Sequence, residues 1–202
     1  MSAEKTIAQM TAEIRDINTE KGWRTGGNTF GDYVALLHSE LSEALEAYRD
    51  HRLADATART ASGTPIPEAK PEGVGSEFAD VLIRLLDMCD LFAITVFDMG
   101  MALADVDPLD PRRNDAGVEL ETFGDWITWL HWRANELWLT RHYAAPFMLR
   151  ALVAAAEHFG FDLTAEYERK VAYNRTRPYQ HGGRTLSEIG RVSPLSAATE
   201  GA

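Results

Sequence analysis

The segment that decides the fold spans residues 30–51 and reads FGDYVALLHSELSEALEAYRDH. Its apolar side chains recur every three or four residues, which is the period of an amphipathic helix with one face against a core. Glu40 and Glu43 lie three residues apart beside this stripe, so their carboxylates share one face of the predicted helix. The stripe consists of Val34, Leu37, Leu41, Leu45 and Tyr48.

A second helix with the same arrangement is expected after a loop, from Ser76 to about Ala104. Glu77 and Asp80 repeat the spacing of three residues and flank Phe78 on its apolar face. Packing the two helices together would bring four carboxylates to one end of an apolar interface, where they repel one another and lose hydration. The sequence therefore indicates a cation site. The alternative is a solvated acidic face, because each motif alone is common on helices.

The residue types favour a hard divalent cation. Oxygen ligands without histidine or cysteine suit Mg²⁺ rather than Zn²⁺, and Mn²⁺ can take the place of Mg²⁺. Such sites keep coordination positions open for phosphates and water. The chain has no Cys/His cluster of the zinc type, and its single cysteine, Cys89, excludes an intramolecular disulfide. We expect one Mg²⁺ site per chain with the ligands Glu40, Glu43, Glu77 and Asp80.

The rest of the chain also follows helical periods, and no stretch alternates with a period of two. Helices are expected at Ser2–Glu20, with a serine N-cap, and at about Asp125–Arg141, Pro146–Phe159 and Thr164–Asn174, the last capped by Thr164. Glycine- and proline-rich segments at 21–28, 52–75 and 105–121 read as loops. These patterns predict an all-α fold with one domain, residues 1–184, and a flexible tail, residues 185–202.

Composition restricts the partners. The chain has 202 residues and a net charge of -11, which argues against binding a nucleic-acid backbone but allows a phosphorylated ligand held through a metal. The N-terminal residues are polar, without the apolar region of a signal peptide. The longest apolar run, residues 91–104, is interrupted by Asp98 and is too short to span a bilayer. We expect a soluble cytoplasmic protein with no membrane partner.

Two segments of the chain are similar to each other. The sequence TFGDYVALLH at 29–38 matches TFGDWITWLH at 122–131. In this alignment Glu40 corresponds to Arg133, and Glu43 corresponds to Glu136. We interpret residues 29–104 as a metal-binding helix pair and residues 122–160 as a degenerate copy, with chance similarity between two amphipathic helices as the alternative. Arg133 has no acceptor atom and cannot ligate a metal. We therefore expect no second metal site in the degenerate copy, and Glu136 is not expected to ligate a metal.

The motifs Glu40-Leu-Ser-Glu43 and Glu77-Phe-Ala-Asp80 resemble the Glu-x-x-Glu and Glu-x-x-Asp signature of the all-α nucleoside triphosphate pyrophosphatases. This superfamily includes MazG, the dCTP pyrophosphatases, the dimeric dUTPases and phosphoribosyl-ATP pyrophosphohydrolase. Residues 170–184, KVAYNRTRPYQHGGR, are similar to the tail of MazG-like proteins. Many relatives have an acidic pair where this chain has Ser39 before Glu40, which leaves the number of metal ions open.

The resemblance implies a four-helix-bundle core, Mg²⁺-dependent hydrolysis of a nucleoside triphosphate to the monophosphate and pyrophosphate, and catalytic roles for Glu40 and Glu43. The general base is not assigned between them. Deoxynucleotides are the expected substrates, for nucleotide-pool cleaning or dNTP control, and phosphoribosyl-ATP is the nearest competitor. Residues 105–160 would replace packing that a partner subunit supplies in relatives, so we expect a homodimer to be optional for folding.

Substrate-binding residues are expected on two segments. Trp23, Phe30 and Tyr33 are candidates to stack on the base. Trp23 lies in a glycine-rich loop where related enzymes place an aromatic residue near the base, whereas ordinary core packing is the favoured alternative for Phe30 and Tyr33. Residues 169–184 contain five basic residues and no acidic one. We expect a phosphate-binding helix and tail at 164–184, with the alternative that the basic residues complement a helix dipole. The expected ligands there are Lys170, Asn174, Arg177 and Arg184.

Two other classes of function remain open at this point. One is a non-catalytic regulator that binds a metal or nucleotide on the same bundle. The other is a helical adaptor without a ligand. Turnover separates the enzyme from the regulator, and ligand-dependent stabilisation separates the regulator from the adaptor.

Overall fold

The computed structural model of the chain describes residues 4–59, 61–63, 66, 69–96, 98–111 and 119–180. This part of the protein is all-helical, and its β-structure is limited to an isolated bridge between Thr6 and Ala102. The α-helices are α1 (Ile7–Glu20), α2 (Phe30–His51), α3 (Val74–Leu91), α4 (Phe123–Thr140), α5 (Ala144–Phe159) and α6 (Leu163–Thr176), with a short 3-10 helix at Leu103–Asp105.

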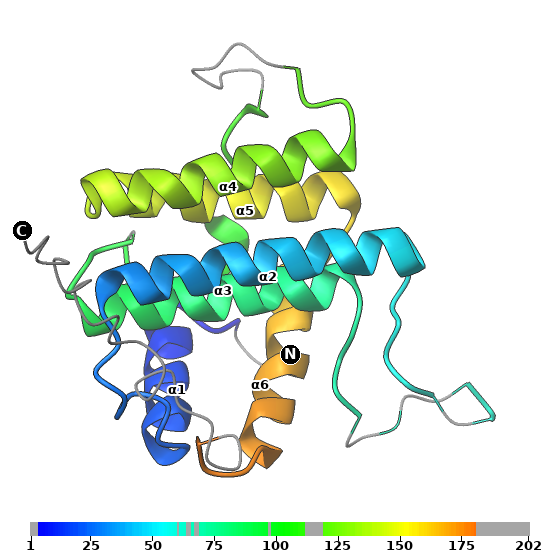
Figure 1. The fold of residues 1–202 in the computed structure, drawn as a ribbon, viewed down its shortest axis with the longest axis horizontal. Helices are drawn as coiled ribbons and strands as arrows, with labels where there is room; N and C mark the ends of the chain where they lie inside the picture. Colours follow the sequence, from blue (N-terminus) through cyan, green and yellow to red (C-terminus); the bar gives the residue numbers. More distant parts are fainter. Residues whose placement is uncertain are drawn as a thin grey trace, which may run out of the picture.

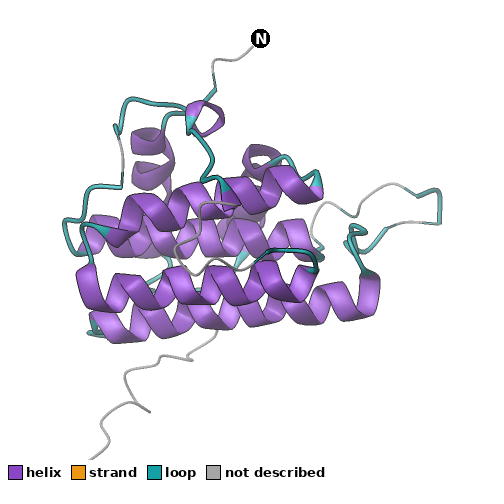
Figure 2. Ribbon diagram, turned by 90° about the horizontal axis from the view of Figure 1, so that it is seen from above, coloured by secondary structure: helices purple, strands orange, loops and turns teal. Residues whose placement is uncertain are grey.

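Four of the helices form a bundle. The helices α2, α3, α4 and α5 lie alongside one another in Figure 1, and each contacts two of the others: α2 packs on α3 and α4, and α5 packs on the same two. The view from above in Figure 2 shows the same lengthwise packing. The helices α1 and α6 cross the far side of α3 and contact each other, so α3 lies between the two layers.

The central position of α3 explains its composition. Most of its 18 residues are buried, because α1, α2, α5 and α6 all pack against it. Its apolar residues join the cores of both layers, and its few charged residues must therefore find partners inside the protein. The carboxylates of Glu77 and Asp87 are both buried on this helix.

The two TFGD segments begin their helices in the same way. Thr29 accepts a hydrogen bond from the backbone N–H of Asp32, whose carboxylate accepts one from the backbone N–H of Thr29. Thr122 and Asp125 form the same reciprocal capping box at the start of α4. Both caps satisfy helix N–H groups that would otherwise have no partner within the helix.

Three predicted helix ends are wrong. The first helix begins at Ile7 and is capped by Thr6 in a capping box with Gln9 rather than by a serine; Ser2 lies outside the described residues. The third helix ends at Leu91 instead of continuing to residue 104, and Ala93 adopts a φ of 53° just beyond it. The cap of α6 is Asp162, whose carboxylate accepts from the backbone of Ala165, and not Thr164.

The tryptophans of α4 divide between core and surface. Trp126 and Trp129 are buried, whereas the side chain of Trp138 at the end of the helix is largely exposed and stacks near Phe30. Phe30 and Tyr33 themselves are buried and contact Phe92, which confirms their assignment to the core. Of the helices described, none has both the length and the apolar character that crossing a membrane requires.

Candidate metal and phosphate site

Three of the four predicted carboxylates converge. Glu40 and Glu43 extend from α2, Glu77 extends from the first turn of α3, and one oxygen of each lies within 4.8 Å of the others. The spacing of three residues on α2 places Glu40 and Glu43 on the face that packs against α3. Such a cluster could hold a metal ion.

The cluster is unevenly buried, and this affects its proton affinity. Glu40 and Glu77 are buried, whereas Glu43 is exposed. Burial raises the pKa of the Glu77 carboxyl to about 7, because the charged form loses hydration. Burial also raises the pKa of Glu40, and the nearby carboxylates of Asp80 and Glu43 act in the same direction against the opposing charge of Arg84. The protein alone therefore compensates these charges incompletely.

One oxygen of the cluster has no partner among the described residues. Glu77 is 4% exposed, and its Oε2 atom accepts no hydrogen bond. A buried carboxylate oxygen in that condition costs free energy. A divalent cation bound by the three carboxylates would remove this cost, so the donor set fits an oxygen-coordinated metal.

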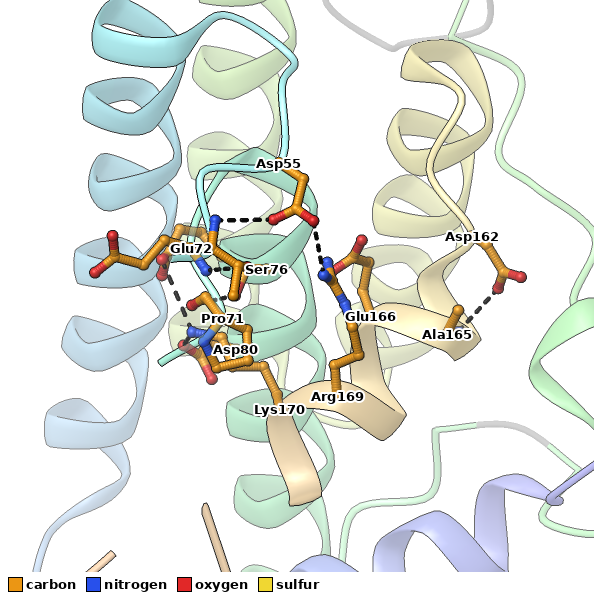
Figure 3. Close-up of polar contacts among 12 residues, drawn as sticks. Asp55, Pro71, Glu72, Ser76, Asp80, Asp162, Ala165, Glu166, Arg169 and Lys170 are labelled. Atoms are coloured by element: carbon orange, nitrogen blue, oxygen red, sulfur yellow. Dashed lines mark hydrogen bonds and ion pairs between the residues drawn. The ribbon is translucent and has the colours of Figure 1, made fainter. Parts of the chain in front are cut away.

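The fourth predicted ligand, Asp80, is already paired. The Nζ atom of Lys170, on α6, lies 2.6 Å from a carboxylate oxygen of Asp80 and 3.8 Å from Glu77 Oε1. Lys170 is 1% exposed, so its ammonium group is enclosed between α3 and α6 (Figure 3). The structure thus brings Lys170 to the acidic cluster itself, and it does not line the open cavity beside it.

That cavity has a volume of about 280 Å³ and connects the predicted metal and substrate residues. It opens next to Glu40, Glu43 and Asp80. Its lining contains more polar than apolar side chains, as expected of a pocket for a charged ligand. The lining residues are Asn18, Trp23, Glu40, Glu43, Lys70, Asp80, Ile83, Arg84, Asp87, Tyr173, Asn174 and Arg177.

Trp23, Asn174 and Arg177 all reach this cavity, although they lie far apart in the sequence. The guanidinium of Arg177 lies 5.2 Å from the centre of the Trp23 ring. The backbone N–H of Gln180 donates to the carbonyl oxygen of Lys21 at 2.8 Å, which joins the glycine-rich loop to the chain after α6. This contact explains how two predicted binding segments form one wall.

Other predicted basic residues are directed elsewhere. Arg169 bonds to Asp55 and Glu166, and Arg175 bonds to Glu13, so neither lines the cavity. Arg184 lies outside the described residues. The described basic residues of the segment therefore do not form a single phosphate clamp. They are distributed among an internal ion pair, surface ion pairs and the cavity wall.

Sequence reasoning missed two arginines next to the site. Arg84 donates to Glu40 Oε1 at 3.1 Å and lies four residues after Asp80, a spacing that could have indicated a shared helix face. Arg24 binds the buried carboxylate of Asp87, and its NH1 atom also lies 2.8 Å from Asp90. No local pattern links Arg24 with α3, because 63 residues separate it from Asp87.

In the second TFGD segment, the residues that correspond to Glu40 and Glu43 are Arg133 and Glu136, and these two form an ion pair with each other. Arg133 is buried, its NH1 atom donates to Glu136 at 2.8 Å, and its guanidinium lies 4.5 Å from the centre of the Trp132 ring. Arg133 thus pairs with a carboxylate of its own helix. Glu136 is occupied by this pair.

Comparisons of the chain with protein-family models, with curated proteins and with solved structures found no match. The proposed function therefore rests on the fold and on the geometry of the site.

Proposed function

We propose that this protein is a nucleoside triphosphate pyrophosphohydrolase that uses Mg²⁺, with Mn²⁺ as a substitute, to release pyrophosphate and a nucleoside monophosphate. The observation that carries the proposal is the junction of two features. A buried carboxylate cluster with an unpartnered oxygen on Glu77 adjoins a cavity with the basic side chains of Arg177 and Lys70. The first feature suits a hard cation, and the second suits phosphates.

The metal would be held by Glu40, Glu43 and Glu77. When bound there, it supplies positive charge against the phosphates and lowers the pKa of water. Asp80 remains ion-paired with Lys170, so its role is to orient that ammonium group and complete the charge balance of the cluster. This arrangement reduces the expected ligand set from four carboxylates to three.

Residues of the chain accept the proton from the attacking water and bind the phosphates and the base. Glu43 is exposed to the cavity and Glu40 is held by Arg84, so either carboxylate of this pair can accept a proton from an attacking water. The water oxygen attacks the α-phosphorus and forms the new P–O bond of the monophosphate. The bond from the α-phosphorus to the bridging oxygen breaks, and that oxygen leaves with the electron pair as part of pyrophosphate. Arg177 and Asn174 bind the phosphates, and Trp23 covers the base with its ring.

Nucleotide turnover tests the proposal. Purified protein is incubated with each canonical dNTP, each canonical NTP and phosphoribosyl-ATP in Mg²⁺, and pyrophosphate and orthophosphate are measured separately. We expect pyrophosphate from at least one nucleotide, with deoxynucleotides preferred, and a loss of about 100-fold or more in Glu43→Gln. Glu46→Gln changes an exposed glutamate on the same helix and should retain activity. Orthophosphate as the product, or full activity of Glu43→Gln, would contradict the mechanism.

A second candidate is binding of a metal-nucleotide complex without hydrolysis. It is favoured by the Lys170–Asp80 ion pair, which already neutralises one carboxylate of the predicted set. Calorimetry in Mg²⁺ separates the two candidates. Saturable binding of a dNTP with no pyrophosphate release would support the regulator, and pyrophosphate release would support the enzyme.

We also infer that the bundle is of the all-α pyrophosphatase type and that α4–α5 descends from a copy of α2–α3. The identical capping boxes support the duplication, and so does the contact between His38 and His131, which occupy the same position in the two segments. Two further contacts are related in this way: Phe30 meets Arg141, and Phe123 meets Tyr48. Such a bundle is closed within one chain, so a homodimer is optional for folding.

A further inference from the structure

We propose that Lys70 contacts the phosphates of the substrate, and that the ion pair between Asp55 and Arg169 positions it there. This inference rests on the proposed function and adds a residue that none of the motifs contains. Lys70 belongs to the long segment between α2 and α3, whose sequence indicates a loop. It nevertheless lines the cavity together with Glu43, Asn174 and Arg177.

The charge of Lys70 is available for a ligand. The residue is exposed, and it has no ion-pair partner in the described part of the chain. It lies close enough to the carboxylate cluster for its charge to oppose the rise in the pKa of Glu77. A flexible ammonium group at the mouth of an acidic, metal-binding cavity is suited to bind a phosphate oxygen as a point charge.

Hydrogen bonds hold the base of the loop together, and they fix the position of the backbone next to Lys70. The backbone N–H of Ala56 donates to the carbonyl oxygen of Glu72 at 3.0 Å, and the backbone N–H of Glu72 donates to Thr57 Oγ1 at 3.1 Å. The hydroxyl of Ser76, on α3, donates to the carbonyl oxygen of Pro71 at 2.8 Å. Lys70 therefore directly precedes a segment that is bonded both to the opposite side of the loop and to α3.

Asp55 connects this base to α6. Its carboxylate accepts from the backbone N–H of Thr57 at 2.9 Å and lies 3.1 Å from Nη1 of Arg169. Figure 3 shows the pair of Asp55 and Arg169. Partial burial opposes ionisation, but the hydrogen bonds from Thr57 and the charge of Arg169 lower the pKa of Asp55 to about 2. The ion pair is thus intact at neutral pH.

Arg169 is a positioning residue because it acts on Lys70 through Asp55. It precedes Lys170 on α6, and Asn174 of the same helix lines the cavity. It is also bonded to Glu166, which fixes its side chain on the helix. This Asp55–Arg169 ion pair is called the clasp. It joins the loop that carries Lys70 to the helix that carries Asn174, and both residues line the same cavity.

A double-mutant cycle on steady-state pyrophosphate release tests the inference. We expect Lys70→Gln to raise KM about tenfold, the loss of one charge-assisted hydrogen bond, while Lys70→Arg largely restores it. Arg169→Gln should raise KM in the same direction. The double variant Lys70→Gln/Arg169→Gln should be no worse than Lys70→Gln alone, because Arg169 acts through Lys70. Equal KM in wild type and Lys70→Gln, or additive effects in the double variant, would overturn the proposal.

The control is another arginine on the same carboxylate. Arg59 NH2 lies 2.7 Å from Asp55, but Arg59 belongs to the loop and does not join it to α6. Arg59→Gln should leave KM unchanged, and a rise equal to that of Arg169→Gln would contradict a specific clasp. If the wild type neither turns over a nucleotide nor binds one in calorimetry, the proposed function fails. If the wild type is active and Lys70→Gln keeps its KM, this inference alone fails.

Discussion

His38 on α2 and His131 on α4 meet edge to edge with nearly parallel rings, whose centroids are 5.0 Å apart and whose Nδ1 atoms are separated by 2.7 Å. One Nδ1 must donate and the other must accept, so the contact requires at least one neutral ring. The two residues occupy matched positions in the TFGD segments, and they meet in the interface between α2 and α4. This pair joins the two halves of the bundle.

Acidification should therefore weaken the bundle at this contact. Burial, and then the neighbouring His38, lower the pKa of His131 below its ordinary value of 6.5. The unfolded chain takes up this proton first, so His131 contributes a fall in the free energy of unfolding as the pH drops below about 6.5. The raised pKa of Glu77 contributes in the opposite direction over the same range, so urea denaturation between pH 7.5 and 5 compares the slope of the wild type with the slopes of variants. His131→Gln should lose less stability on acidification than the wild type, whereas the exposed His142→Gln should behave as the wild type does. The same slope in all three proteins would refute this assignment.

Removal of Lys170 should destabilise the protein strongly. Lys170→Met leaves Asp80 and Glu77 without their cation in a buried environment, and breaking such a pair typically costs about 3–5 kcal/mol. Arg175→Met breaks the pair of an exposed arginine with Glu13 and should cost at most about 1 kcal/mol. Chemical denaturation of both variants gives the comparison. Similar losses would mean that Lys170 is not the main compensating charge.

Divalent metal should raise the melting temperature of the wild type. A cation that binds only the folded cluster at a hundred times its Kd stabilises by about 2.7 kcal/mol. Glu77→Gln should lose this response, and Glu46→Gln, on the exposed side of α2, should keep it. Differential scanning calorimetry in EDTA and in Mg²⁺ gives the result. A metal response that survives in Glu77→Gln would move the site away from these carboxylates.

Gly73 should not tolerate a side chain. Its φ is 111°, and an added Cβ would lie 2.8 Å from the carbonyl oxygen of Ala54. Gly73→Ala should destabilise by about 1–3 kcal/mol and should also raise KM, since the contact lies at the base of the Lys70 loop. Gly63→Ala is the control, because Gly63 has a φ of 84° but an added Cβ would have no atom of the described residues within 4 Å. It should cost about 1 kcal/mol and leave KM unchanged. If both variants behave alike, the contact with Ala54 does not matter.

The carboxylate cluster was predictable because helical spacing determines which side chains share a face. The helical period of residues 30–51 was enough to predict that Glu40 and Glu43 share one face. The apolar face of the next helix was enough to predict that Glu77 lies beside them. The partner of Asp80 was not predictable in this way. Lys170 was expected to meet phosphates, and its burial between α3 and α6 depends on how distant helices pack.

The loops were the least predictable part of the molecule. The apolar run after Leu91 suggested a longer helix, but Ile94 and Val96 are buried in an irregular segment instead. Burial explains their composition equally well in either conformation, so the sequence did not distinguish the two. Lys70 was missed for a related reason: a loop residue reaches a site through tertiary contacts, which leave no period in the sequence.

The two sides of the α2–α4 interface belong to one chain, and this changes how they can vary. In a homodimer with twofold symmetry, every substitution appears on both sides of the axis at once. In this chain, a substitution in α4 leaves the sequence of α2 unchanged, and a substitution in α2 leaves that of α4 unchanged. Phe30 already meets the guanidinium of Arg141 at 4.4 Å, whereas Phe123, its matched residue, stacks on the ring of Tyr48 at 4.1 Å. An engineer can therefore change a residue on the α4 side of the interface, such as Arg141, while every residue of α2 stays as it is.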